Sequence, residues 1–308
     1  MKRLKESLLD KGRSSLQILK KLLKNPLSFT GLLLLLMFSF MAIAAPWLAP
    51  PPNPREPYMI PREGFWATPH PPNHKHPFGT TGGQYDIYYG IIWGTRTAFR
   101  VGIEVTFSIV FIGIILGSIS GYFGGFIDNL IMRLVDLMFA FPGILGAIVL
   151  TTVLGKGLNS VILAFILVGW PFYARLMRGE VLHIRENDYV AAARAIGAGP
   201  LRIMFRHVLP NTIFVVFAVA TLDIGSQMVG VAALSFFGLG SPVGYADWGQ
   251  IISFSRVWIT GSAGNPLQFW YTLIYPGAAI LLFVLAFALI GDAFRDILDP
   301  RLRGTRAG

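Results

Sequence analysis

The sequence predicts an all-α integral membrane protein with six transmembrane helices, and two observations carry that prediction. Hydrophobic residues make up 54% of the 308 residues and charged residues only 14%, whereas a soluble domain carries about 25% charged residues. The apolar residues also occur in runs that reach the roughly 20 residues needed to cross about 30 Å of hydrocarbon. The composition excludes an ordinary soluble enzyme, and the absence of cysteine excludes a disulfide framework and a thiolate metal site.

Six apolar segments define the predicted spans. Each contains few charged residues, and most contain glycine, which membrane helices tolerate. The fourth is the shortest, and a Phe-Pro-Gly sequence at residues 141–143 predicts a kink within the third. The predicted spans are residues 28–48, 98–121, 134–154, 161–176, 212–234 and 269–290.

The distribution of basic residues predicts the orientation of these spans. Of the 26 lysines and arginines, 19 fall on the side of the two termini and 7 on the other side, and basic residues accumulate on cytoplasmic loops. Both termini are therefore expected in the cytoplasm. Nucleic-acid binding is not expected, because the positive charge is spread over several short loops rather than one folded face.

Residues 1–27 are predicted to form a basic cytoplasmic segment. Its leucines recur at helical spacing between lysines, which fits a helix on the anionic inner membrane surface or, as the alternative, a solvated tail. Residues 28–48 follow as the first transmembrane helix. The small residues at 42–44 resemble a signal-peptide cleavage site, but the long segment before the apolar run and the length of that run favour an uncleaved span.

Residues 49–97 form a proline-rich extracytoplasmic segment. Proline at this density opposes helices and central strands, so an extended, irregular cap on the outer face is expected. His70, His74 and His76 lie close together in this segment. They could bind a metal, but their spacing matches no specific site, so a solvated loop is the preferred interpretation.

Residues 98–293 are predicted to form a five-helix membrane core, followed by a cytoplasmic tail at residues 294–308. Glycines at 121, 124 and 125 mark a tight turn, and they are not a phosphate loop because no Gly-Lys-Ser/Thr follows. On the next helix Asp136 stands three residues after Arg133, a spacing that allows an ion pair. In the outer loop, aromatic residues such as Trp248 are expected at the membrane interface or around the mouth of a transport path.

The cytoplasmic loop at residues 178–211 is the most informative segment. An alanine-rich helix is predicted over residues 189–196, with Asn187 or Asp188 as its cap and glycines at 197 and 199 at its end. Pro200 can open a second short helix. The alanines allow another surface to approach closely, which favours a helix that docks on a partner over a plain amphipathic connector.

Two carboxylates lie within predicted spans: Glu104 in the second and Asp223 in the fifth. A charge at the bilayer centre costs at least about 2.5–3.5 kcal/mol, so each carboxylate should face protein or water. Each is a candidate for lining a transport path. The alternative is burial beside a polar partner, for which Arg100, one helical turn before Glu104, is the obvious choice.

These segments together resemble the permease subunits of ATP-binding-cassette (ABC) importers of the oligopeptide, dipeptide and nickel type. The cytoplasmic loop matches the family's Glu-Ala-Ala–x3–Gly–x9–Ile-x-Leu-Pro signature through Ala192, Ala193, Gly197, Leu209 and Pro210. Three further segments match in order: His-Pro-Phe-Gly-Thr at 76–80, the aromatic and glycine-rich outer loop at 233–240 with Trp-Gly at 248–249, and the C-terminal segment at 291–303. The resemblance runs from about residue 26 to residue 303.

The chain departs from the family pattern at several positions. Ala191 stands where the signature has glutamate, His207 where it has isoleucine, and Val231 where glutamate is frequent. After residue 80 the sequence Thr-Gly-Gly-Gln-Tyr-Asp replaces the usual continuation to Gly-Arg-Asp. These departures bear on the substrate more than on the mechanism.

The resemblance implies a channel-forming, non-enzymatic subunit without a cofactor. Its implied partners are a second, non-identical permease subunit, two ATP-binding subunits, an extracytoplasmic solute-binding protein and membrane lipid. The ATPase-coupling residues implied by matching positions are Tyr189, Ala191, Ala192, Ala193, Arg194, Gly197, Leu209 and Pro210. A Gly197→Asp substitution is expected to leave assembly largely intact but to lower transport, because a side chain would fill the glycine elbow.

Peptides are the expected substrate, with oligosaccharides or nickel as alternatives. A secondary transporter is a remote alternative, since it would usually show internal repeats and broken helices, and no clear repeat is visible. An intramembrane enzyme is another, since Glu104 and Asp223 could form an aspartyl-type pair, but the spans contain no histidine and no motif-spaced companion for either carboxylate.

Overall fold

The computed structural model describes residues 25–64, 68–259, 265 and 267–298. Within these residues the fold is helical, and β-structure is limited to three isolated bridges. The predicted surface helix in residues 1–27 lies almost entirely outside the described residues. Of the predicted tail at 294–308, residues 294–298 are helical and the rest lie outside the described residues. The helices are α2 Pro26–Leu48, α3 Ile87–Phe123, α4 Gly125–Phe139, α5 Gly143–Leu154, α6 Leu158–Arg185, α7 Asp188–Ala195, α8 Pro200–Ile203, the π-helical turn η1 Met204–Val208, α9 Leu209–Phe236, α10 Trp248–Ile259 and α11 Tyr271–Leu298.

Among the described residues, five helical segments are long and apolar enough to cross a membrane. They are α2, α3, α6, the continuous stretch Pro200–Phe236 and α11. The third predicted span is broken, because α4 and α5 meet at an angle of 89°. The bend lies at Pro142, and it encloses an apolar groove of about 350 Å³ against Val168 of α6. The kink predicted at residues 141–143 is therefore confirmed, and it divides the span into two separate helices.

Two helices extend further than their apolar runs predicted. Helix α3 begins at Ile87 because the Asp86 carboxylate accepts a hydrogen bond from the Tyr89 amide at 2.9 Å and caps the helix. The last residues of the predicted irregular segment, 87–97, are thus helical. Helix α6 runs from Leu158 to Arg185 rather than over 161–176, because its polar inner half packs on neighbouring helices instead of forming a loop.

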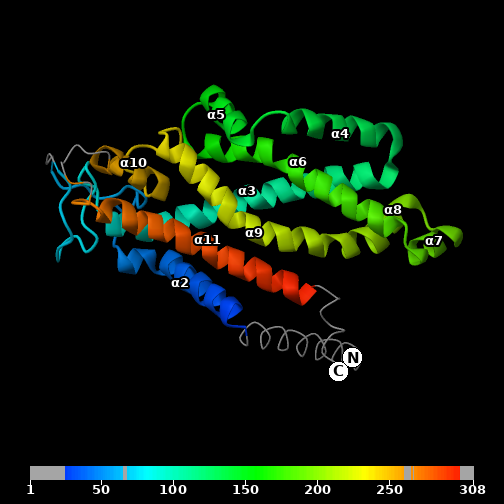
Figure 1. The fold of residues 1–308 in the computed structure, drawn as a ribbon, viewed down its shortest axis with the longest axis horizontal. Coiled ribbons are helices and arrows are strands. Elements are labelled where there is room, and N and C mark those ends of the chain that lie inside the picture. The colour runs from blue at the N-terminus through cyan, green and yellow to red at the C-terminus, as the bar shows by residue number, and fades with distance from the viewer. Residues whose placement is uncertain (1–24, 65–67, 260–264, 266, 299–308) are drawn as a thin grey trace.

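Helix α3 packs closely against α6 through three glycines spaced four residues apart. Cβ atoms placed at Gly113, Gly117 and Gly121 would lie within 2.9 Å of atoms of α6, two of them within 2.4 Å. Small residues at this spacing allow membrane helices to approach closely. This contact joins α3 and α6, and α9, α2 and α11 also pack against α3 (Figure 1).

The molecule has two dissimilar ends (Figure 1). At one end, which we call the outer end after the predicted orientation, lie α10 and the described residues of segment 49–86; this segment is called the outer cap. At the opposite end, called the inner end for the same reason, lie α7 and α8, together with the start of α2 and the last turns of α11. The ends of the first and last spans therefore share a side with the predicted docking loop, as an even number of spans requires.

The described residues of the outer cap contain no helix, as its prolines predicted, but the cap is not a solvated loop around all three of its histidines. His76 is only 8% exposed, and Thr80, Thr81 and Gln84 are buried. Backbone hydrogen bonds join the cap to the segment before α10, from Ile60 N to the Gly244 carbonyl and from Ala246 N to the Tyr58 carbonyl. Long-range pairing of this kind leaves no periodic signal in the sequence.

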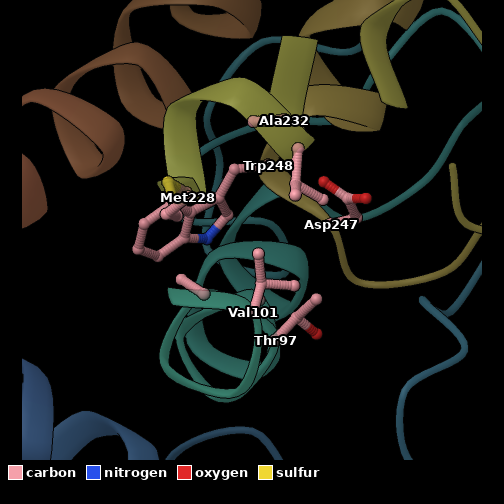
Figure 2. A pocket seen from close by; sticks show the side chains of 9 residues that line it. Thr97, Val101, Met228, Ala232, Asp247 and Trp248 are labelled. Carbon is pink, nitrogen blue, oxygen red and sulfur yellow. The ribbon is translucent and has the colours of Figure 1, made fainter. Parts of the chain in front are cut away.

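Trp248 is a core residue rather than an interfacial anchor. It is 1% exposed, and its indole nitrogen donates to the Ile91 carbonyl at 3.2 Å. Figure 2 shows its ring between α9, which carries Met228, and α3, which carries Val101, beside a pocket of about 10 Å³. That volume is about the space that one water needs, so α10 is packed tightly onto the bundle.

Candidate coupling site and transport path

Helix α7 is a short, cleanly terminated helix at the inner end of the molecule. Its last turn closes with the Gly197 amide donating to the Arg194 carbonyl at 3.0 Å and the Ala198 amide donating to the Ala193 carbonyl at 3.1 Å. This is the Schellman pattern, which requires a left-handed residue after the helix. Gly197 has φ of +83°, so glycine is required there by backbone conformation, as its predicted role in ending the helix implies.

The residues predicted for coupling divide between the two faces of this loop. Ala193 is 6% exposed and packs into the core of the chain, and Leu209 is partly buried against the same core cluster. The other predicted coupling residues are exposed: Tyr189, Ala191, Ala192, Arg194, Gly197 and Pro210. Ala193 therefore positions the helix from within, and the exposed alanines at 191 and 192 form its open side.

The sequence reasoning missed the most exposed apolar residues of this loop. Ile196 is 86% exposed at the tip, Leu201 60% and Phe205 61%. An exposed apolar group of this kind is a candidate interaction surface. Its signal in the sequence is the set of large apolar residues that stand close to the helix-ending glycines.

The π-helical turn that follows has a local cause. Pro210 has no amide hydrogen, and its ring clashes with the carbonyl four residues earlier. The helix widens just before it, and the Leu209 amide donates to the Met204 carbonyl five residues back. A π-turn at this point joins the loop to α9 without breaking the helix.

Helix α6, which leads into α7, is fastened to α3 and α4 by arginines. Arg178 donates two hydrogen bonds of 2.6 Å to the Asp128 carboxylate of α4, and Arg185 donates to the Gly121 carbonyl of α3 at 3.0 Å. Asp136 pairs with Arg175 of α6 and not with Arg133, the partner that its spacing allows within one helix. Bidentate arginine–carboxylate bonds fix orientation as well as distance, so α4 and the inner half of α6 form one unit.

Glu104 has the partner that sequence spacing predicted. Arg100 donates to its carboxylate at 3.2 Å and also to the side-chain oxygen of Asn159, on α6, at 2.8 Å. The Arg100 and Glu104 side chains are 48% and 46% exposed. Their ion pair is therefore half open on the surface of the single chain, at the outer part of α3.

Asp223 has different surroundings. Its carboxylate accepts from the Tyr173 hydroxyl of α6 at 3.1 Å and from the Gln227 amide at 2.9 Å, and Tyr173 is fully buried. The two membrane carboxylates thus have separate partners and do not form an aspartyl pair with each other. Among the described residues, no group of three or more histidine, aspartate or glutamate side chains could hold a metal ion.

Comparison with known proteins agrees with this architecture. The family model for "binding-protein-dependent transport system inner membrane component" matches residues 113–304. The model for the "N-terminal TM domain of oligopeptide transport permease C" matches residues 16–63. The inward-facing MetNI methionine ABC transporter shares the fold, with a TM-score of 0.51 at 21% identity over 68% of this chain and 97% of that chain.

Relatives of known name match nearly the whole chain. The dipeptide transport system permease protein DppC of Alkalihalophilus pseudofirmus is 36% identical over 92% of this chain and 89% of the relative. The glutathione transport system permease protein GsiD of Shigella flexneri is 36% identical over 91% of this chain and 88% of the relative. The chain therefore belongs to the family of binding-protein-dependent transport system inner membrane components, the multi-pass permease subunits of ABC transporters.

Proposed function

We propose that this chain is one of two permease subunits of an ATP-driven importer of di- and oligopeptides. A related, non-identical permease would complete the path, two ATP-binding subunits would supply the energy, and an extracytoplasmic solute-binding protein would deliver the peptide. The relatives named for dipeptide and glutathione transport support a peptide substrate. Oligosaccharides and nickel are the competing outcomes of the uptake test below.

The observation that carries the proposal is the exposed apolar tip of the α7–α8 loop. Ile196, Leu201 and Phe205 are each at least 60% exposed in this chain, and the alanine face at 191–192 allows a partner to approach closely. A short helix seated in a groove is an established recognition mode. The partner that fits is the ATP-binding subunit, since this end shares its side with both terminal spans and both termini are predicted to be cytoplasmic.

The contacts of α6 support a route for the mechanical signal. When the ATP-binding subunits close, a displacement of α7 would move α6, and the arginine bonds to Asp128 and Asp136 would carry α4 with it. The hydrogen bond from Tyr173 to Asp223 would carry the movement to α9. The chain's role is conduit and transmission, and ATP hydrolysis belongs to the partners.

The half-open Arg100–Glu104 pair is the best candidate for lining the peptide path. Charged groups at this depth must meet protein or water, and its own chain covers only about half of each side chain. Peptides carry both charges, so a paired cation and anion suit their passage. Asp223 instead serves as a tie between α6 and α9, because both of its bonds are made within the chain.

The docking assignment can be tested with two equally simple substitutions at opposite ends. Ile196→Asp places a charge on the exposed tip of α7, and Val243→Asp does so on an outer-end residue that is 68% exposed. Both positions face away from the core, so both variants should fold. The expected result is that Ile196→Asp loses co-purification of the ATP-binding subunits while Val243→Asp retains it. Retention by both variants would overturn the docking assignment.

The substrate class requires the assembled complex. The chain is purified with its partners, reconstituted in vesicles and supplied with the binding protein. ATP-dependent uptake of a labelled dipeptide is expected, with no response to a proton gradient. Uptake of nickel or an oligosaccharide in its place would refute the peptide assignment, and uptake driven by a proton gradient would refute the ABC mechanism.

A further inference from the structure

We propose that His76, in its charged form, is a pH-dependent latch that holds the outer cap on the start of helix α3. The proposal rests on geometry in a segment that neither the coupling site nor the transport path uses. It does not depend on which solute the transporter carries.

The His76 ring lies between two carboxylates, one at each nitrogen. Its Nδ1 is 2.6 Å from the Asp86 carboxylate and its Nε2 is 3.1 Å from the Glu63 carboxylate. A carboxylate only accepts hydrogen bonds, and a neutral imidazole has one N–H to donate. Both bonds form together only when the ring carries both protons and a positive charge. The charged ring is 8% exposed, so these bonds replace most of its contact with water.

The bonds connect segments that are otherwise joined mainly through the backbone. Asp86 is the residue that caps α3, and Glu63 belongs to the proline-rich part of the cap. His76 itself is held by a turn in which its amide donates to the Asn73 side chain at 2.9 Å. The ring thus ties a tight turn and an extended segment to the first residue of a central helix.

The charged neighbours favour the protonated ring. Asp86 and Glu63 are anionic, and Lys75 pairs with the outer oxygen of Glu63. Helix α11 contributes the neutral phenols Tyr271, against Gly79, and Tyr275, stacked on Phe78 at 4.2 Å. Burial lowers the pKa of His76, but the bonds to the two carboxylates outweigh burial and raise it.

The sign of the pH effect follows from this raised pKa. The latch contributes fully below the ordinary histidine value of about 6.5. Its contribution is lost as the pH rises through the raised value, because the neutral ring must release one carboxylate. A metal is not needed to explain the cluster, since carboxylates on opposite ring nitrogens cannot converge on one ion.

The test compares His76→Gln with His74→Gln, a histidine two residues away that is exposed. Amide hydrogen exchange of residues 73–90 is measured by mass spectrometry in the full complex, with each variant compared with the parent at the same pH so that the intrinsic exchange chemistry cancels. Exchange in His76→Gln should exceed that of the parent about tenfold at pH 6, the factor that one charge-assisted hydrogen bond provides. The ratio should approach one at pH 9, and His74→Gln should match the parent throughout.

A second variant keeps the test decisive if His76→Gln folds poorly. Glu63→Gln changes an exposed carboxyl outside the core and removes one of the two charges that favour the protonated ring. The pH at which cap protection is lost should then fall. Two results would overturn the latch. One is protection of residues 73–90 in the parent that does not change between pH 6 and 9. The other is a ratio of exchange rates, His76→Gln over parent, that is constant with pH.

Discussion

The two ends of this permease differ in how far a single chain completes them. At the outer end, Trp248 is 1% exposed and Asp247 5%, and the Gln250 side chain bonds to three backbone groups of the preceding loop. At the inner end, Ile196 and Leu201 project with most of their surface uncovered. The outer end packs these groups within the chain, whereas the inner end leaves large apolar side chains exposed where we propose that a partner docks. Substitutions at the outer end should therefore affect folding, and substitutions at the inner end should affect coupling.

The largest expected effect is on the outer end. A Cβ at Gly249 would lie 2.1 Å from the Ala232 carbonyl oxygen of α9, and that backbone cannot move without displacing α10. Gly249→Ala should cost about 3 kcal/mol or more and leave little folded protein by fluorescence-detected size-exclusion chromatography. Gly199→Ala, at an exposed site with no atom near the added carbon, is the control. Equal recovery of folded Gly249→Ala and Gly199→Ala would contradict the proposed difference between the two ends.

The two membrane carboxylates test the region between the ends. Asp223→Ala leaves the buried Tyr173 hydroxyl without its acceptor, which should cost about 1–3 kcal/mol without changing which peptides are taken up. Glu104→Ala removes a half-exposed pair worth roughly 0–1 kcal/mol, but it should change the preference between cationic and anionic dipeptides. Thermal melts and competitive uptake measure the two properties separately. If the preference between cationic and anionic dipeptides changed only in Asp223→Ala, Asp223 would line the path and Glu104 would have the structural role.

At the inner end the sharpest comparison is between two neighbouring glycines. The added carbon of Gly197→Ala meets no atom of this chain. Steric crowding within the subunit is therefore not the expected cause of a transport defect at this position. The left-handed backbone instead costs a non-glycine residue roughly 1–2 kcal/mol. Gly197→Ala should keep assembly but lower peptide transported per ATP hydrolysed, whereas Gly199→Ala, with φ of −66°, should match the parent. An unchanged ratio in Gly197→Ala would argue against α7 as the coupling element.

The same contrast explains what the sequence could and could not predict. The inner end follows local signals that are visible along the chain: Gly197 in a helix-ending motif, Pro200 at the first turn of α8, and Pro210 after a π-turn. The outer end depends on contacts such as the hydrogen bond from Trp248 to Ile91, 157 positions apart, which no local pattern reveals. The glycine contact of α3 with α6 is an intermediate case. The four-residue spacing of its glycines is visible in the sequence, but the sequence does not show which helix they contact.

The smallest effect concerns a buried charge at the outer end. Burial raises the pKa of Asp247, and hydrogen bonds from Ser241 and the Gly249 amide offset only part of that change. Because the folded state disfavours the charged form, this residue's contribution to stability falls as the pH rises through the raised value. Asp247→Asn keeps one oxygen to accept from the Gly249 amide, and its NH2 group can donate to the Ser241 hydroxyl, without the charge. The free energy of unfolding of this variant at pH 7.5 should equal that of the parent or exceed it by up to about 1 kcal/mol, and the difference between the two proteins should shrink toward pH 5.

The control is Glu56→Gln, which changes an exposed carboxylate at the same end and should follow the parent at every pH. Greater destabilisation of Asp247→Asn at pH 7.5 than at pH 5 would mean that the charge itself holds the outer end together, and the outer end would then depend on electrostatics rather than on packing.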